Sequence, residues 1–213
     1  ADTLSHEMTF ISAPKNNLKN IYQSFIDCDL EVERLISRTF ALGAKLLDEK
    51  ELKLGSALIN LEHENVSLGL FKNFALVHSA MIPIGANHIT KDISKVCSLN
   101  LEESEIIKNS IDFSFENNSN IFDKNNYLKN NYFINSNYRK ISKDLILNVV
   151  RSRIDEIFDK LKKQLIIPGF NLGFGISFLL AGEGSNFINL DKYCKFFFKS
   201  DVKLINNNII EEK

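Results

Sequence analysis

Three apolar segments joined by very short connections constrain the fold of this chain more than any other feature. They are ALINL, VSLGLF and ALVHSAMI, at residues 57–61, 66–71 and 75–82. Each has the length and aliphatic content of a strand, and the second alternates apolar and small side chains. Connections this short join antiparallel neighbours, because a parallel pair needs a crossover of roughly a dozen residues or more. The pattern therefore predicts a three-stranded antiparallel meander.

Helices and further strands are expected on both sides of the meander. Upstream we expect a strand at 6–12, a helix after Ser12 with an apolar stripe, a strand at 31–37, a helix at 38–47 and a charged loop at 48–51. Downstream we expect helices at 88–97, 101–109 and 142–165, a strand at 175–180, a glycine turn at 181–185 leading into a helix that ends at 198, and a strand at 202–205. Residues 112–137 are expected to form short strands on long loops. This mixed order predicts an α/β fold.

Composition narrows the class of protein. The net charge of −1 gives no basic excess for nucleic acid, and 44% hydrophobic residues can bury a core. Three widely spaced cysteines, Cys28, Cys97 and Cys194, argue against a disulfide framework or a cysteine zinc site, so we expect small buried thiols in a reducing cytoplasm. No apolar run has the ~20 residues that span a bilayer. Because the chain begins Ala1-Asp2-Thr3 rather than with Met, a fragment of a longer protein is one interpretation.

Three stretches resemble one protein family, in the same order along the chain. They are IDCDLEVERLI (26–36), LFKNFALVHSAMIPIGANHITKDISK (70–95) and VVRSRIDEIF (149–158). The second is the most specific, since it resembles an IP-x-G-G-N-x-x-T-x-D-I segment at Ile82, Pro83, Gly85, Asn87, Thr90, Asp92 and Ile93. The third resembles an I-I-x-x-R-x-x-E helix. The family that these stretches resemble is FtsA, a bacterial cell-division protein of the actin/Hsp70-type superfamily.

The resemblance implies an actin-like (ribonuclease H-like) second lobe with an inserted α+β subdomain, plus the end of the first lobe. The implied ranges are 1–54 for the end of the first lobe, 55–85 and 153–213 for the two parts of the second lobe, and 86–152 for the inserted subdomain. It also implies an adaptor that binds the C-terminal tail of FtsZ, forms actin-like polymers and works at the cytoplasmic face of the inner membrane at the division site. The membrane contact of the family is a C-terminal helix that this sequence does not contain.

The phosphate loop of the family is altered here. Family members carry D-I-G-G-G-T-T-D/S, and the aligned residues are NLEHENVS (60–67), so the three glycines are gone and the acidic residue is Asn60. Glu62 and Glu64 would face a polyphosphate, and like charges ~4 Å apart cost about 4 kcal/mol per pair at an intermediate dielectric. His63 could join both as a metal site, although a solvated loop is the commoner meaning of such a sequence. ATP stays the candidate cofactor, but this loop argues against hydrolysis, Mg²⁺ and tight binding.

The other side of the nucleotide site matches the family better. LLAGEGS (179–185) resembles V-L-T-G-G-G/A-S, with Glu183 in place of a glycine, and a Glu-x-x-Lys pair matches one that lies against adenosine in the family. The candidate nucleotide-binding residues are Gly85, Asn87, Glu105, Lys108, Gly182, Gly184 and Ser185. The alternative for the Glu-x-x-Lys pair is an exposed i,i+3 helix pair.

Basic residues of the inserted subdomain are candidates for the contact with the acidic and apolar FtsZ tail. They are Arg139, Lys140, Lys143, Arg151 and Arg153. Arginine suits this role because its planar fork binds both oxygens of a carboxylate. The alternative is a solvated helix face, for instance with Arg151 paired to Asp155. Apolar Ile141, Leu145 and Ile146 either line a groove for the tail or belong to the core.

The sequence therefore favours a non-enzymatic cell-division adaptor. Two rivals stay open: an active actin-like ATPase with an altered phosphate loop, and another actin-like scaffold such as a pilus-assembly protein. The second rival predicts no binding to FtsZ.

Overall fold

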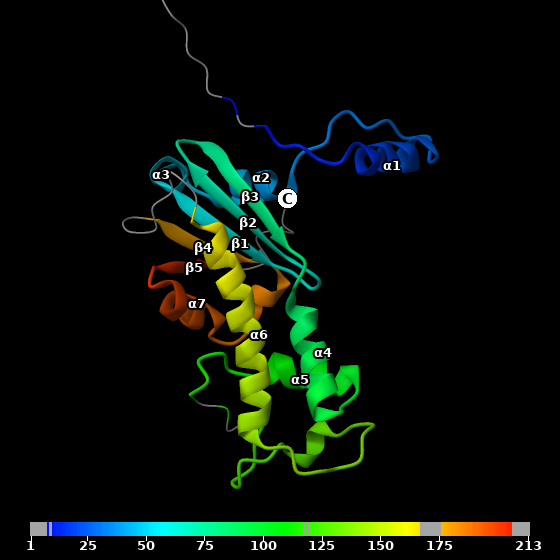
Figure 1. The fold of residues 1–213 in the computed structure, drawn as a ribbon, viewed down its shortest axis with the longest axis vertical. Coiled ribbons are helices and arrows are strands. Elements are labelled where there is room, and N and C mark those ends of the chain that lie inside the picture. The colour runs from blue at the N-terminus through cyan, green and yellow to red at the C-terminus, as the bar shows by residue number, and fades with distance from the viewer. Residues whose placement is uncertain (1–7, 9, 117, 119, 167–175, 206–213) are drawn as a thin grey trace, which may run out of the picture.

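A five-stranded mixed sheet forms the centre of the molecule (Figure 1). The protein is described by a computed structural model for residues 8, 10–116, 118, 120–166 and 176–205. The strands are β1 (Ser56–Leu61), β2 (Val66–Lys72), β3 (Ala75–Ile82), β4 (Ser177–Ala181) and β5 (Val202–Leu204), in the order β3-β2-β1-β4-β5. The pairs β1–β2 and β2–β3 are antiparallel, which confirms the meander, and β1, β4 and β5 are parallel.

The helices follow the expected order closely. They are α1 (Lys15–Ile26), α2 (Arg38–Leu46), α3 (Glu49–Leu54), α4 (Ala86–Cys97), α5 (Leu101–Ser110), α6 (Lys143–Gln164) and α7 (Leu190–Phe198), with 3₁₀ turns η1 (Asn130–Tyr132) and η2 (Glu183–Asn186). Two helices begin where the sequence indicated. The Asn100 side chain accepts from the Glu103 N–H to start α5, and the Ser142 hydroxyl accepts from the Leu145 N–H to start α6.

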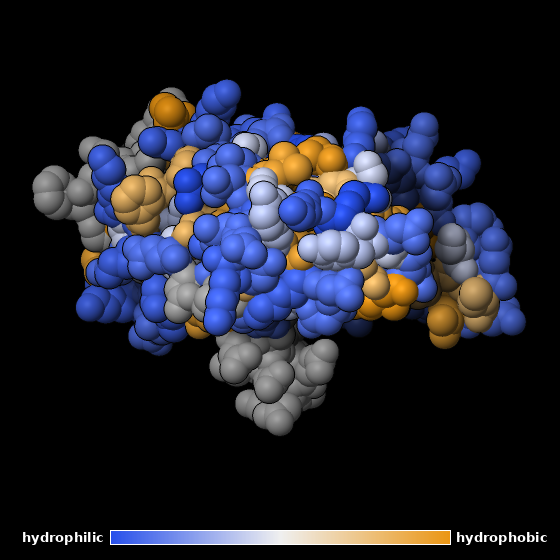
Figure 2. All heavy atoms as spheres, turned by 90° about the horizontal axis from the view of Figure 1, so that it is seen from below, coloured by the Kyte–Doolittle hydropathy of each residue, from blue (hydrophilic) through white to orange (hydrophobic). Residues whose placement is uncertain are grey.

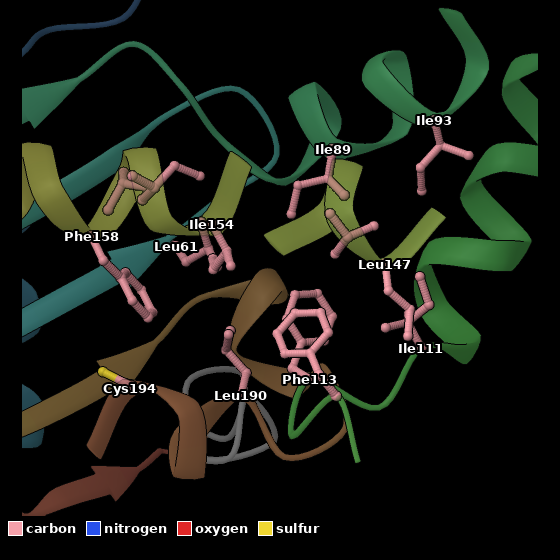
Figure 3. Packing of buried hydrophobic residues seen from close by; sticks show 14 of the residues in the cluster. Leu61, Ile89, Ile93, Ile111, Phe113, Leu147, Ile154, Phe158, Leu190 and Cys194 are labelled. Atoms are coloured by element: carbon pink, nitrogen blue, oxygen red, sulfur yellow. The ribbon is translucent and has the colours of Figure 1, made fainter. Parts of the chain in front are cut away.

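The larger hydrophobic core lies on one face of the sheet. Strand residues alternate in the manner of period-2 side chains, so that Ala57, Ile59 and Leu61 enter this core while Leu58 points to the opposite face. Figure 3 shows side chains from α4, α6, β1 and α7 meeting in this cluster. The long helix α6 supplies Ile154 and Phe158, which are both buried, and so holds the sheet and the inserted segment together.

The opposite face of the sheet is covered by α2, which lies very close to it. A Cβ on Gly43 of α2 would lie 2.0 Å from the ring of Phe71, and a Cβ on Gly69 of β2 would lie 2.5 Å from a methyl carbon of Thr39. The two glycines therefore allow the helix to approach the sheet, with Phe71 filling the space between them. Leu46 completes this smaller core.

The inserted segment consists of α4, α5 and the residues that lead to α6, and Figure 1 shows it extending beyond one end of the sheet. Its long loop contains isolated bridges, Phe122 to Leu128 and Tyr127 to Ser142, and no extended ladder among the described residues. Buried Glu103 organises this loop by accepting hydrogen bonds from Ser136 and from the backbone N–H of Asn135. The helix α6 runs without a break across the expected boundary at 152/153.

Some expectations about local structure were wrong. Residues 31–37 form no strand, and the described residues of 6–12 form none either. The charged segment at 48–51 starts α3, because Asp48 and Glu51 form a reciprocal capping box. The residues after β4 form η2 and a short turn before α7, so one continuous helix does not run from Ser185 to 198.

The first helix has the expected apolar stripe, but it buries none of it. Figure 1 shows α1 projecting away from the rest of the molecule, and Ile21, Tyr22 and Phe25 are exposed. Its stripe lines one side of an apolar groove of about 960 Å³, with Phe40 and Phe74 on the other side. The periodicity thus predicted the helix correctly, but none of the residues of α1 is buried.

The sequence led us to expect three buried cysteines, but only Cys97 and Cys194 are buried. Burial raises the pKa of the Cys97 thiol to about 11 and that of the Cys194 thiol to about 12, whereas Cys28 is exposed. No helix in the described ranges is both long and apolar enough to cross a bilayer.

Candidate functional sites

The carboxyl ends of β1 and β4 lie side by side, which brings the expected nucleotide residues together. Asn60 pairs with Ala181 in the parallel ladder, and Gly182 follows with a positive φ of 92°. A Cβ on Gly182 would lie 2.3 Å from the Leu61 carbonyl oxygen and 2.8 Å from Oδ1 of Asn60. The buried Ser185 hydroxyl donates to the Gly182 carbonyl at 2.6 Å. These residues therefore contact the end of β1 and one another.

The loop after β1 lies against the first turn of α4. The Ala86 N–H donates to the Glu62 carbonyl at 2.8 Å, and the Asn87 N–H donates to the His63 carbonyl at 2.8 Å. A Cβ on Gly85 would meet backbone atoms of this loop at 2.5 Å. The Asn87 amide also donates to Glu64 at 2.5 Å, which lowers the pKa of that exposed carboxyl. Both Gly85 and Asn87 are thus engaged by the 62–65 loop.

The Glu62 carboxylate is enclosed by groups of the same chain. One oxygen, Oε1, accepts from the Asn60 amide at 2.8 Å and pairs with a guanidinium nitrogen of Arg38 at 2.5 Å. The Glu62 side chain is 19% exposed. The amide and the guanidinium, both of which could face a phosphate, are already bound to a carboxylate.

The Glu105–Lys108 pair differs from an ordinary surface pair. The Lys108 side chain is only 2% exposed, and its ammonium donates to Glu105 at 2.7 Å and lies 5.3 Å from the centre of the Phe187 ring. Glu105 also accepts from the Thr90 hydroxyl at 2.5 Å. Burial alone would raise the pKa of Glu105. The hydrogen bonds from Lys108 and Thr90 outweigh this effect, so the pKa is lowered. The pair therefore links α5 to α4 and to the segment that follows η2.

The residues expected at the phosphate end of the site are bound to groups of the same chain. The loop that cradles phosphate in the family has no glycine here and carries the carboxylates of Glu62 and Glu64, and atoms of residues 60–65 lie close against Gly85, Gly182 and Gly184. His63 lies 3.7 Å from Glu64, and no group of three acidic, histidine or cysteine side chains among the described residues is arranged to hold a metal ion.

The five basic candidates for partner binding do not form one patch. Arg139 donates to the carbonyls of Cys97 and Ser98, and so caps the end of α4. Lys140 lies over the Tyr127 ring at 5.6 Å, and Arg151 lies over the Phe115 ring at 4.4 Å rather than beside Asp155.

Lys143 and Arg153 both belong to α6, but they have different surroundings. Lys143 lies in the first turn, and its backbone N–H donates to the Asn126 carbonyl at 2.8 Å. Arg153 lies further along the helix, where it forms a two-pronged ion pair with Asp92 at 2.5 and 3.1 Å and a further contact with Glu156 at 2.5 Å.

A groove of about 350 Å³ runs between α4 and α6. Its lining combines the partly exposed Val96, Leu145 and Val149 with the Asp92–Arg153–Glu156 cluster of charges. Leu145 is 41% exposed, whereas the two neighbouring apolar candidates, Ile141 and Ile146, are core residues. Figure 2 shows that the end of the molecule seen from below is mostly hydrophilic, with apolar side chains in small separate patches.

The helix α4 connects the sequence motifs in a way that the motifs alone did not indicate. Thr90 and Asp92 contact Glu105 and Arg153, so residues of one motif hold residues of two others. Thr90 and Asp92 are polar residues of an amphipathic helix. Such a pattern indicates that their side chains make contacts, but it does not indicate which residues they contact. Arg38 was missed altogether, because nothing in its sequence surroundings links it to Glu62.

A comparison with known protein families decides the class of this chain. The family model described as cell division protein FtsA matches residues 57–212. The chain belongs to the FtsA family. Over 203 residues it is 23% identical to cell division protein FtsA from Agrobacterium fabrum, and over 211 residues it is 24% identical to that from Bacillus subtilis. The alignments cover 95% and 97% of this chain and 46% of each relative, so the chain spans about half the length of the curated relatives it matches.

Solved structures show that this FtsA-family chain has an actin-like fold. It is similar to MreB5 of Spiroplasma citri bound to AMPPNP, with a TM-score of 0.60 and 23% identity over 92% of this chain and 62% of that one. It is also similar to the MamK filament, with a TM-score of 0.60 and 11% identity over 92% of this chain and 61% of that one. A chain in a PilM–PilN type IV pilus biogenesis complex gives a TM-score of 0.61 and 15% identity over 90% of this chain and 48% of that one.

Proposed function

We propose that this chain is the part of a cell-division adaptor that binds the C-terminal tail of FtsZ, in the groove between α4 and α6. The observation that carries the proposal is the apolar part of the groove, where Leu145 and Val96 are exposed. Arg153 also lines the groove and is paired there with Asp92 and Glu156. An acidic and apolar tail would present apolar side chains to the groove, and its carboxylate would compete with Asp92 and Glu156 for the guanidinium.

The wider role follows from family membership and extends the proposal beyond this chain. The whole protein would form actin-like polymers and link FtsZ to the cytoplasmic face of the inner membrane, through the C-terminal membrane helix that the resemblance to the family implies. Nucleotide hydrolysis is no part of the proposal, and nucleotide binding is weak or absent. The support for this is the loop at 62–65, whose carboxylates and contacts replace a phosphate cradle.

A binding titration tests the groove. A labelled FtsZ tail peptide is titrated with the 213-residue chain at low and high salt, and fluorescence anisotropy is measured. We expect binding that weakens at high salt, because the acidic peptide and Arg153 attract each other across water. Leu145→Ser should weaken binding about five- to tenfold through lost apolar contact. Arg153→Lys should weaken it as well, since lysine keeps the charge but lacks the fork.

Lys163→Ala is the matched control, because Lys163 is an exposed cation of the same helix, about 15 Å from Arg153 along the axis. Equal loss in Lys163→Ala and Arg153→Lys would show non-specific attraction and contradict the groove. A folded chain that does not bind the peptide would favour a different actin-like scaffold.

A further inference from the structure

We propose that the Glu62 carboxylate is a built-in anion that ties α2 to the end of β1 where the family's loop takes phosphate, and that its removal opens an anion site formed by Arg38 and Asn60. The inference does not depend on FtsZ binding.

Two backbone hydrogen bonds hold Glu62 in place independently of its side chain. Its N–H donates to the Asn65 carbonyl at 2.9 Å, and its carbonyl accepts from the Ala86 N–H at 2.8 Å. The carboxylate is thereby held between β1 and α2, where it meets Asn60 and Arg38. The Glu62 side chain is 19% exposed, so it loses less side-chain entropy in this pair than a mobile surface glutamate would, whereas the Arg38 side chain is 72% exposed.

The position of Arg38 makes the pair more than a chance surface contact. Arg38 is the first residue of α2, where the positive end of the helix dipole disfavours a cation. The carboxylate of Glu62 balances the charge of this guanidinium, which lies 2.5 Å away. Without Glu62, the guanidinium of Arg38 and the amide of Asn60 would lose the carboxylate oxygen that they share, and both are donors that bind an oxyanion.

Two consequences can be measured. Glu62→Ala should lower the melting temperature by about 2–4 °C, as expected for one lost interaction in a chain of this size. Inorganic pyrophosphate should then raise the melting temperature of Glu62→Ala relative to sodium chloride at the same ionic strength, while neither pyrophosphate nor Mg²⁺-ATP should stabilise the original chain. Adding Arg38→Met to Glu62→Ala should abolish the pyrophosphate effect.

Glu64→Ala is the matched control, because it removes an equal charge from the same loop while leaving the Arg38–Glu62 pair intact. A similar pyrophosphate effect in Glu64→Ala would overturn the proposal, as would stabilisation of the original chain by pyrophosphate. If Glu62→Ala does not fold, a thermodynamic cycle of Arg38→Met and Glu62→Gln decides. Additive losses of melting temperature would contradict the pair, and a double variant no less stable than the worse single variant would support it.

Discussion

Buried charge in this protein is balanced within the chain, and Glu103 is the clearest single residue. Its carboxylate is fully buried, and it accepts from the Ser136 hydroxyl at 2.6 Å and from the backbone N–H groups of Asn100, Asn135 and Ser136. Burial alone would raise its pKa, but these hydrogen bonds prevail and lower the pKa to about 2 from an ordinary value of 4.5. One side chain thus starts α5 and fixes the loop that returns toward α6.

The depressed pKa of Glu103 predicts a particular acid dependence of stability. Because the folded-state pKa lies below the unfolded one, the contribution of Glu103 is fully present above about pH 4.5 and is lost as the pH falls toward 2. Glu103→Gln should lower the free energy of unfolding at neutral pH by about 1–3 kcal/mol, by leaving buried N–H groups poorly matched. The measurement is urea unfolding of both proteins between pH 7 and about pH 3.

The exposed neighbour Glu102→Gln is the control, and it should leave the acid dependence unchanged. An unfolding free energy of Glu103→Gln that falls with acid as steeply as that of the original chain would contradict the assignment.

Secondary elements were predictable where a local signal determines them. The meander, α4, α5 and α6 follow from apolar periodicity and from caps such as Asn100 and Ser142. The helix α3 could also have been found, because Asp48 and Glu51 have capping-box spacing, but the charged composition of the segment suggested a loop. The strand expected at 31–37 failed for a different reason: a strand needs a neighbouring strand to pair with, and no local pattern shows whether one exists.

The contact between α2 and the sheet gives a prediction at the scale of elements. Gly43→Ala should improve helix propensity by about 1 kcal/mol, but its methyl group would overlap the Phe71 ring. Overpacking of a core commonly costs about 1–3 kcal/mol, so we expect net destabilisation, or at best no gain, in thermal or urea unfolding.

Phe71→Leu in the same chain provides the control for Gly43→Ala. The smaller side chain makes room for the methyl group, so the double variant should lose less stability than the sum of the two single variants. Strict additivity would show that Gly43 is not needed for close approach. A clear gain in stability from Gly43→Ala alone would show the same.

At the scale of the whole molecule, the sheet and the inserted segment are organised around α4 and α6. The order of elements and the actin-like fold could be predicted from sequence, because they depend on periodicity and on motifs that are read in order. The pairing of charges could not, since Asp92 meets Arg153 and Arg38 meets Glu62 only after the chain has folded. This is also why five basic residues that looked like one partner site have separate surroundings, of which the α4–α6 groove contains Arg153.

The central claim is that the groove between α4 and α6 binds the FtsZ tail, and hydrogen–deuterium exchange with and without the tail peptide tests it most directly. We predict slower exchange on peptide binding in the second half of α4 and in α6 around residues 145–156, which border the groove, with no change in α1 or α3. Binding accompanied by slower exchange at the sheet or α1 instead, with α4 and α6 unaffected, would contradict the account.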